Sequence, residues 1–383
     1  MNLLFDLIAT QPNASGKRHG GGRYAEIILK RMVERNITFS CYYDSKKWLN
    51  PEIEIMCREK NIKLFDIQKN TLKEIVNKNK INRIYSALPV NIADINYCEV
   101  YGTIHGLRGF ETPFDKFFYY YEHSFKDLLR YLRDQIKYQY LTKKTKDKFR
   151  QKYLNNNLHF ITVSEHSKYA ILSYFPEMKD KNIPVFYSPN TSIGTSNKIN
   201  QINSQKYFLL VSGNRWEKNN LRAIIAFDRL ISNGLIKNMR MKITGAFENN
   251  YKYKIKNPDF FDFLGYVDDE KLESLYANAY VFVYPSLNEG FGYPPIEAMK
   301  YHIPVIASPY SSIAEICNSG ALFFNPYSIE EIMNRMMMIQ DNKIYKSYSK
   351  SGYNQYLRIK ERQDKDLDLL IDYIIRYPTS KDL

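Results

Sequence analysis

The feature that most constrains the fold of this chain is an apolar run followed by a helix that begins with prolines. Residues 280–284 read YVFVY, a continuous apolar run typical of a parallel strand covered on both faces. Residues 288–299 read NEGFGYPPIEAM, in which the prolines suit the first turn of a helix. Gly290 and Gly292 let the backbone between these elements approach a bulky group. This stretch therefore predicts a strand, a tight turn and a helix.

The predicted turn suits a ligand that carries both negative charge and hydroxyl groups. Amides from Gly290 to Gly292, with a helix N-terminus behind them, favour an anion. Glu289 and Glu297 flank these amides, and carboxylates accept hydrogen bonds from hydroxyls. A phosphate with sugars attached fits both requirements. The alternative is an ordinary strand-to-helix turn with two solvated glutamates, which the spacing of the two acids disfavours.

The same stretch resembles the E-x7-E signature of the retaining glycosyltransferases of family 4, which have the GT-B fold. The resemblance covers most of residues 261–326, through FLGYVDDEKLESLYANAYVFVYPSLNEGFG, HIPVIASPYSSIAEI and SGALFFNP. It implies an α/β fold of two Rossmann-like domains with parallel sheets facing a central cleft. It also implies that Glu289 binds hydroxyls of a donor sugar, that Glu297 binds a ribose, and that Phe291 contributes to donor binding.

Length and composition narrow the classes of partner. A chain of 383 residues favours two domains, and Lys and Arg exceed Asp and Glu by 55 − 41 = 14. Such a basic chain suits nucleic acid, an anionic membrane or phosphorylated ligands. The four cysteines lack metal or redox spacing, and neither a signal peptide nor a spanning helix is apparent. We therefore expect a cytoplasmic protein whose membrane contact, if any, is peripheral.

A glycine cluster follows the first predicted strand, residues 2–9. Gly20, Gly21 and Gly22 lead into an amphipathic helix, a place where α/β sheets approach phosphates. Neither GxGxxG nor the P-loop pattern is present, so mobile loop glycines are an equal alternative. The segment is similar to the family's GGxGRYA, which implies donor contact by Gly21 and Gly22. The neighbouring residues 17–18, Lys-Arg, suit solvated surface charge or an anionic acceptor.

His105 follows a predicted strand, residues 99–104, where ligands bind in parallel sheets. A lone histidine is more often structural. Resemblance to the family's T-x-H-D/G segment instead implies that His105 lies beside the donor sugar.

Residues 117–157 are rich in Tyr and Phe and strongly basic. From Lys116 to Lys152 the chain has eleven Lys or Arg and four acids, a net charge of +7. An apolar stripe recurs at helical spacing, through Phe125, Leu128, Leu129, Leu132, Ile136 and Tyr140. One interpretation is an amphipathic core helix with a solvated basic face. The other is a surface for anionic lipid and a lipid-diphosphate acceptor.

The second half of the chain adds candidate contacts for a nucleotide. Arg215 and Lys218 follow a predicted strand, residues 207–212, and precede a helix, so they suit either a diphosphate or solvent. They resemble the family's R-x4-K-N phosphate clamp, although their spacing is shorter. Tyr266 and Val267 lie after a strand tip, where the resemblance implies contact with the base.

Several residues at helix ends are predicted to be structural. Ser164 and Asp268 are good N-caps, and Ser312-x-x-Glu315 reads as a capping box. His302 stands where family members usually carry a helix-ending glycine, so it needs a positive φ or a different cap.

These features predict four regions in the chain. Residues 1–188 form an acceptor-side domain, 189–206 a linker, 207–345 a nucleotide-sugar domain and 346–383 a helical region that crosses back to the first domain. The expected reaction is transfer of a hexose from a nucleotide-diphosphate sugar to a glycan or lipid-linked acceptor, with retention, in surface polysaccharide or lipopolysaccharide synthesis.

The predicted catalytic residues are Glu289, His105, Lys218 and Arg215. Because no suitable DxD motif is present, we expect no metal and no cofactor; Arg215, Lys218 and the turn amides would stabilise the leaving diphosphate. A GT-B sugar-nucleotide epimerase is the alternative enzyme. A basic nucleic-acid-binding protein is a further alternative, but the chain has no such motif, so we expect no nucleic-acid partner.

Overall fold

The computed structural model describes residues 2–12, 20–93, 95–112, 115–154, 157–189 and 205–376, without the side chains of residues 138, 139 and 141. The chain divides into two compact units. The first lies within Met1–Gly106, Lys143–Thr191 and Glu361–Leu383, and the second within Leu107–Thr142 and Ser192–Lys360. Most of the predicted linker and the basic pair at residues 17–18 lie outside the described residues.

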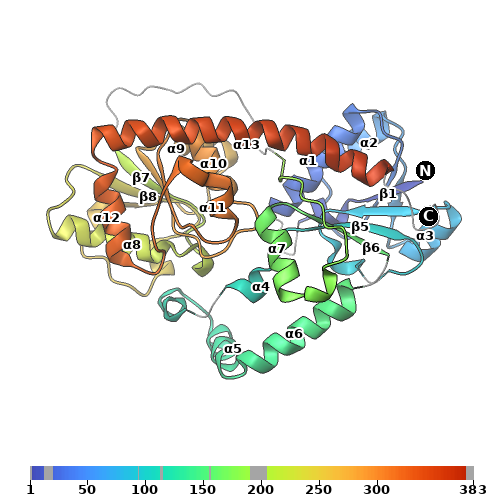
Figure 1. Ribbon diagram of the computed structural model, residues 1–383, viewed down its shortest axis with the longest axis horizontal. Coiled ribbons are helices and arrows are strands. Elements are labelled where there is room, and N and C mark those ends of the chain that lie inside the picture. The colour runs from blue at the N-terminus through green and yellow to red at the C-terminus, as the bar shows by residue number, and fades with distance from the viewer. Residues whose placement is uncertain are drawn as a thin grey trace. The chain divides into compact units, whose positions relative to one another are not determined.

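The first unit contains a six-stranded parallel sheet in the order β3-β2-β1-β4-β5-β6 (Figure 1). Its strands are β1 (Leu3–Asp6), β2 (Ser40–Tyr43), β3 (Leu64–Asp66), β4 (Arg83–Ser86), β5 (Glu99–Ile104) and β6 (Leu158–Thr162). Its helices are α1 (Gly20–Glu34), α2 (Pro51–Glu59), α3 (Leu72–Lys78) and α7 (Glu165–Tyr174). The alternation of strand and helix confirms the predicted α/β class.

The C-terminal helix α13 (Asn342–Arg376) contributes to both units, and its residues from Glu361 onward group with the first. There Asp372 accepts a hydrogen bond from Arg35 of α1 at 2.6 Å. Gln363 donates to the carbonyl of Ser188 at 2.6 Å. Polar contacts thus hold this part of α13 within the first unit.

The second unit repeats this architecture with the order β12-β11-β10-β7-β8-β9. Its strands are β7 (Tyr207–Leu210), β8 (Arg240–Ile243), β9 (Phe261–Phe263), β10 (Val281–Tyr284), β11 (Val305–Ala307) and β12 (Ala321–Phe323). Its helices are α4 (Arg108–Glu111), α5 (Phe125–Ile136), α8 (Asn220–Ser232), α9 (Asp269–Asn278), α10 (Tyr293–Lys300), α11 (Ser312–Cys317) and α12 (Ile329–Met338), with α6 (Tyr138–Tyr153) running from this unit into the first. Helices α8 and α12 lie side by side over a core that includes β7 and β10 (Figure 1).

Each sheet reverses its strand order at one point, between β1 and β4 in the first unit and between β7 and β10 in the second. Ligands of open parallel sheets bind at the carboxyl ends of the strands beside such a reversal. All four residues of β7 and all four of β10 are buried, as the apolar runs predict. The residues that follow β7 and β10 are therefore the first to examine for function.

Residues 107–142 group with the second unit, whereas the sequence places them in the first domain. Asp115 accepts two hydrogen bonds from Arg222 of α8, at 2.5 and 2.8 Å. The Tyr121 hydroxyl accepts from the amide of Leu221 at 3.2 Å. The sequence of residues 107–142 does not indicate which unit they belong to, because their attachment depends on these distant partners.

The structure differs from the sequence-based prediction at the start of two helices. Gly20, Gly21 and Gly22 form the first turn of α1 instead of a loop. Ser311 is the N-cap residue of α11, without a side-chain cap bond, so the predicted capping box at Ser312 is wrong. Ser312 uses its hydroxyl for other acceptors, described below.

Three other predictions about helix ends are confirmed. The hydroxyl of Ser164 and the carboxylate of Asp268 cap α7 and α9. His302 has φ 59°, and its ring stacks on Tyr353 at a centroid distance of 3.8 Å. A non-glycine residue at this helix end needs a positive φ or a different cap, and His302 has the positive φ.

The apolar stripe of α5 is on the surface, which contradicts its interpretation as a core stripe. The exposed fractions are 74% for Phe125, 51% for Leu129, 42% for Leu132 and 84% for Ile136. Tyr131, on another face, is buried and stacks on Phe118 at 3.9 Å. In the part of the chain that the structure describes, no helix combines the length and apolar character needed to cross a membrane.

Candidate active site

Lys218 and Glu289 meet beside the strand reversal of the second unit. Lys218 ends a short 3-10 helix, Trp216–Lys218, which follows β7, and Glu289 lies in the turn after β10. The Lys218 Nζ atom donates to Glu289 Oε1 at 2.5 Å, and both side chains are buried. The structure therefore brings together two residues that the sequence predicts separately.

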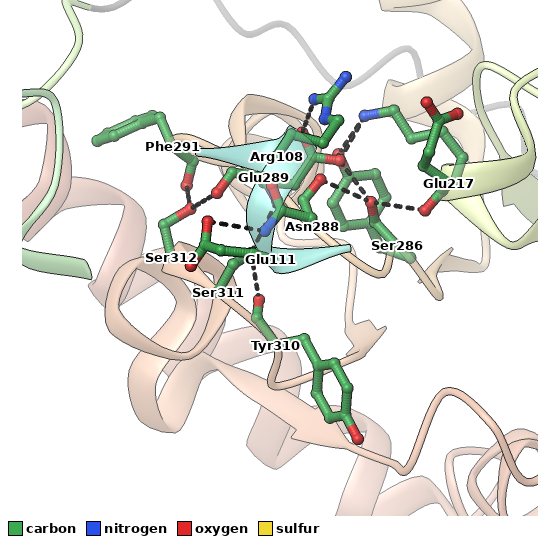
Figure 2. Close-up of polar contacts among 12 residues, drawn as sticks. Arg108, Glu111, Glu217, Ser286, Asn288, Glu289, Phe291, Tyr310, Ser311 and Ser312 are labelled. Carbon is green, nitrogen blue, oxygen red and sulfur yellow. Dashed lines mark hydrogen bonds and ion pairs between the residues drawn. The ribbon is translucent and has the colours of Figure 1, made fainter. Parts of the chain in front are cut away.

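Three donors converge on one oxygen of Glu289 (Figure 2). Besides Lys218, the Tyr284 hydroxyl donates to Oε1 at 2.7 Å and the Ser286 hydroxyl at 2.5 Å. Lys218 also donates to the Tyr284 hydroxyl at 2.9 Å. The other carboxylate oxygen, Oε2, lies 3.8 Å from Nη2 of Arg108. Buried charge is tolerated here because it is both paired and hydrogen-bonded.

These contacts keep the Glu289 carboxylate ionised. Burial alone would raise its pKa, but the charge of Lys218 and hydrogen bonds from Lys218 and Ser286 outweigh burial and lower the pKa to about 2. Burial lowers the pKa of Lys218, and the positive charges of Arg215 and Arg108 lower it further, while Glu289 opposes this change. The site thus consists of an anionic hydrogen-bond acceptor, the Glu289 carboxylate, surrounded by cations.

Two consecutive serines hold the turn that carries Glu289 (Figure 2). The Ser311 hydroxyl accepts from the amide of Glu289 at 2.7 Å. The Ser312 hydroxyl lies within donating distance of the carbonyls of Glu289 and Phe291, at 3.0 and 2.9 Å. Gly292, the N-cap of α10, has φ 101°, a conformation that favours glycine. The turn is therefore fixed at several consecutive residues.

Asn288 and Glu289 also contact the short helix α4. Asn288 donates from Nδ2 to Glu111 Oε2 at 3.1 Å, and Arg108 pairs with Glu289 (Figure 2). Both partners belong to α4. This short helix thus contributes two charged side chains to the site.

The other donor-binding candidates of the second unit lie on separate elements. Glu297 is half-buried on α10, where it accepts a hydrogen bond from Tyr276; burial and Glu297 together raise the pKa of that phenol. Tyr266 is 72% exposed and follows β9, with half-buried Val267 beside it. Arg215 is also exposed.

His105, Gly21 and Gly22 belong to the first unit and are described within it. His105 follows β5, and its Nε2 atom lies 3.0 Å from the carbonyl of Ala87. Its ring packs edge-on against Tyr24 of α1 at 4.7 Å. A Cβ on Gly21 would meet the Leu88 side chain at 3.0 Å. The start of α1, the end of β5 and the segment after β4 are thus packed together.

The sequence alone did not identify Arg108, Tyr284, Ser286, Ser311 and Ser312 as parts of the site. Tyr284 and Ser286 carried a usable signal, because two polar groups two residues apart at a strand end share one face. Ser311 and Ser312 are 21 to 23 residues from the groups that they bind in the turn, and no spacing rule connects them.

Residues 193–358 match the family described as glycosyl transferases group 1. One relative, the O-antigen chain mannosyltransferase RfbU of Salmonella typhimurium, is 33% identical over 171 residues, which are 44% of this chain and 47% of that protein. This chain thus spans about half the length of that relative.

Two solved structures share the fold. A glycosyltransferase from Rickettsia africae has a TM-score of 0.67 at 13% identity, covering 98% of this chain and 99% of that chain. HepE of Anabaena, solved in complex with UDP and glucose, has a TM-score of 0.65 at 14% identity, with 98% and 99% covered. These similarities confirm the predicted GT-B fold.

Proposed function

We propose that this chain, whose residues 193–358 match the family described as glycosyl transferases group 1, transfers a sugar from a nucleoside-diphosphate sugar to a hydroxyl of a glycan or lipid-linked glycan. The observation that carries this proposal is the ionised Glu289 carboxylate among the cations Lys218, Arg215 and Arg108. Carboxylates accept hydrogen bonds from sugar hydroxyls, and cations bind phosphates. A nucleoside-diphosphate sugar needs both.

In the proposed reaction, the bond between the anomeric carbon and the diphosphate breaks while the acceptor oxygen bonds to the same face of that carbon. The leaving diphosphate takes the proton of the acceptor hydroxyl, so configuration is retained. Negative charge on the diphosphate is stabilised by Arg215, Lys218 and the amides from Gly290 to Gly292, without a metal ion. Lys218 uses two of its three N–H groups on Glu289 and Tyr284, which leaves one for phosphate.

The remaining donor contacts follow from the family resemblance. Glu289 holds hydroxyls of the transferred sugar, and Glu297 holds the ribose. Phe291 lines the donor site, while Tyr266 and Val267 contact the base. From the first unit, His105 is assigned to the donor sugar, and Gly21 and Gly22 to the diphosphate.

The relatives support a place in polysaccharide synthesis. The similar protein RfbU is an O-antigen chain mannosyltransferase, so we propose a hexose donor and an acceptor that belongs to a surface polysaccharide or lipopolysaccharide. GDP-mannose is the first donor to test on this ground, and UDP-glucose the second, because HepE was solved with UDP and glucose.

The test is a thermal-shift screen over UDP-, GDP-, dTDP- and ADP-linked sugars, followed by turnover with a glycan acceptor. We expect one nucleotide series to raise the unfolding midpoint and Glu289→Gln to reduce turnover by about 100-fold or more. Sugar rearrangement without an acceptor would instead indicate an epimerase. A salt-dependent shift with DNA or RNA, and none with nucleotide sugars, would indicate a nucleic-acid-binding protein.

We also propose that α5 docks on the inner face of the cytoplasmic membrane, where it contacts anionic lipid. Its exposed residues Phe125, Leu129, Leu132 and Ile136 recur at helical spacing. Four cations lie on the same helix or directly after it: Lys126, Arg130, Arg133 and Lys137. An apolar stripe with flanking cations suits a bilayer that carries anionic lipid, where a cation contributes about 1 kcal/mol. Arg130 and Arg133 already pair with acids of the same helix, so their contribution is smaller.

Vesicle co-sedimentation tests this contact. We expect binding to vesicles with anionic lipid, weakening with added salt, and loss of binding in the double variant Leu129→Asp, Ile136→Asp. Leu357→Asp is the matched control, since Leu357 is a 45% exposed leucine on α13. Equal binding to neutral vesicles, or an equal loss in the control, would overturn the proposal.

A further inference from the structure

The segment of residues 107–112 and 115–122 is anchored to the second unit at several residues. The Asp115 carboxylate is buried and accepts two hydrogen bonds from the equally buried Arg222 guanidinium. The amide of Lys252 donates to the carbonyl of Tyr120 at 2.6 Å. These attachments fix the position of α4, at the start of the segment, within the unit that carries Glu289.

Arg108 is the residue of this segment that faces the Glu289 carboxylate (Figure 2). Its Nη2 atom lies 3.8 Å from Glu289 Oε2, which is close enough for an ion pair but too far for a hydrogen bond. Nearby, the bond from Asn288 to Glu111 joins the same short helix to the same turn. Arg108 is therefore held beside the site by contacts of its neighbours.

One guanidinium donor of Arg108 is unused among the described residues. Its Nε atom is buried and donates to no acceptor among the described residues. A buried donor without an acceptor is costly, and such groups in folded proteins usually have a partner or a function. The side chain as a whole is 39% exposed, so a ligand in the site can reach it.

The charges around Glu289 favour an anion as that ligand. Although burial raises the pKa of Glu289, the charges of Lys218 and Arg108 lower it. Arg215 acts on Lys218. Three cations thus stand against buried Glu289 and half-buried Glu111. Arginine binds anions with two oxygens particularly well, because its planar fork matches their geometry. A diphosphate supplies such oxygens and two or more negative charges.

We propose that Arg108 is a donor-binding residue, which takes the diphosphate of the nucleoside-diphosphate sugar together with Lys218. This inference rests on the proposed function and adds a cation from outside residues 193–358, the part of the chain that matches the family. A carboxylate on an acidic donor sugar has the same two-oxygen chemistry, so the experiment must separate the two sources.

The experiment measures binding of UDP, GDP and their uronic-acid conjugates by calorimetry to the full chain and to Arg108→Gln. A hydrogen bond to a charged group contributes about 1.5–3 kcal/mol, so we expect roughly 10- to 100-fold weaker binding of the nucleoside diphosphate in the variant. Arg108→Lys keeps the charge without the fork and should lie between the two. Arg229→Gln is the control, because it removes an arginine of the same unit that pairs only with exposed Glu330 in the described chain.

Each other outcome overturns the inference. One such outcome is that the unaltered chain and Arg108→Gln bind a nucleoside diphosphate with equal affinity. That result would refute the role of Arg108 and leave the proposed function standing. A loss confined to nucleoside-diphosphate uronic acids would assign Arg108 to a sugar carboxylate. Weaker binding together with a lower unfolding midpoint of the unliganded variant would show a structural role. Failure of the unaltered chain to bind any nucleoside diphosphate would refute both proposals.

Discussion

Lys218 Nζ lies 2.5 Å from Glu289 Oε1, and this buried pair joins the segment after β7 to the turn after β10. The two strands are neighbours at the reversal of their sheet. The pair is supported by hydroxyls of Tyr284 and Ser286, so neither charge is without a partner. The same contact therefore contributes to the stability of the second unit and prepares its site for a ligand.

Removing Glu289 should cost stability as well as activity. Glu289→Ala leaves Lys218 buried without its counter-ion, a change that typically destabilises a protein by about 3–5 kcal/mol. Glu289→Gln keeps the shape and still accepts hydrogen bonds from Ser286 and Tyr284, so its cost should be smaller. Differential scanning calorimetry, with turnover measured in parallel, should show turnover strongly reduced in both variants but Glu289→Ala unfolding at the lower temperature. Equal midpoints would contradict the structural role of the pair.

The low pKa of Glu289 predicts loss of stability in acid. Its carboxyl titrates at about 2 in the folded chain, against an ordinary value of 4.5. The folded state therefore favours the ionised form, and this contribution is present above pH 4.5 and lost as the pH falls toward 2. The difference corresponds to about 3 kcal/mol. Unfolding free energies of the unaltered chain should fall over this range, and those of Glu289→Gln should fall less.

Asp6 in the first unit should respond to pH with the opposite sign. Burial raises its pKa from 3.8 to about 6, despite hydrogen bonds from Ser86 and Tyr42. The folded state therefore favours the protonated form, so this contribution is present below pH 3.8 and lost as the pH rises through 6. Asp6→Asn should remove this loss, measured as a flatter unfolding free energy between pH 4 and 6. An unchanged slope in that range would refute the assignment.

Much of the site could be predicted because its main residues follow buried strands. Lys218 and Glu289 each come shortly after an apolar run, and parallel strands bring their carboxyl ends to one edge of the sheet. The glycines and prolines of residues 290–295 also marked the turn and the start of α10. Local sequence was sufficient wherever the site depended on consecutive residues.

The rest of the site depends on contacts between distant segments. Asp115 and Arg222 are 107 residues apart, and their ion pair attaches the segment that begins at residue 115 to α8. Nothing near Arg108 or Ser312 indicates which turn they contact. The exposed stripe of α5 shows the same limit, since helical spacing of apolar residues does not tell whether a protein core or another surface covers them.

Breaking the Asp115–Arg222 pair should loosen the segment that carries Arg108. Asp115→Ala leaves the Arg222 guanidinium buried and uncompensated, at a cost of about 3 kcal/mol or more. Hydrogen exchange followed by mass spectrometry should show faster exchange in residues 115–122, where the amide of Glu122 donates to the carbonyl of Asn250 at 2.8 Å. Arg229→Gln, which breaks an exposed pair, should leave exchange there unchanged. Unaltered protection in Asp115→Ala would show that the other contacts hold the segment by themselves.

Ser312 should matter for donor binding through the turn that it holds. Ser312→Ala removes the hydroxyl shared between the carbonyls of Glu289 and Phe291, a loss of about 1 kcal/mol that corresponds to roughly fivefold in kcat/KM if the turn shifts in the donor complex. Ser349→Ala is the matched control, since it removes a similar hydroxyl bond to the carbonyl of His302, outside the turn. Steady-state kinetics over a range of donor concentrations should show the loss in Ser312→Ala alone. Equal kcat/KM values for the two variants would mean that the turn keeps its geometry without Ser312.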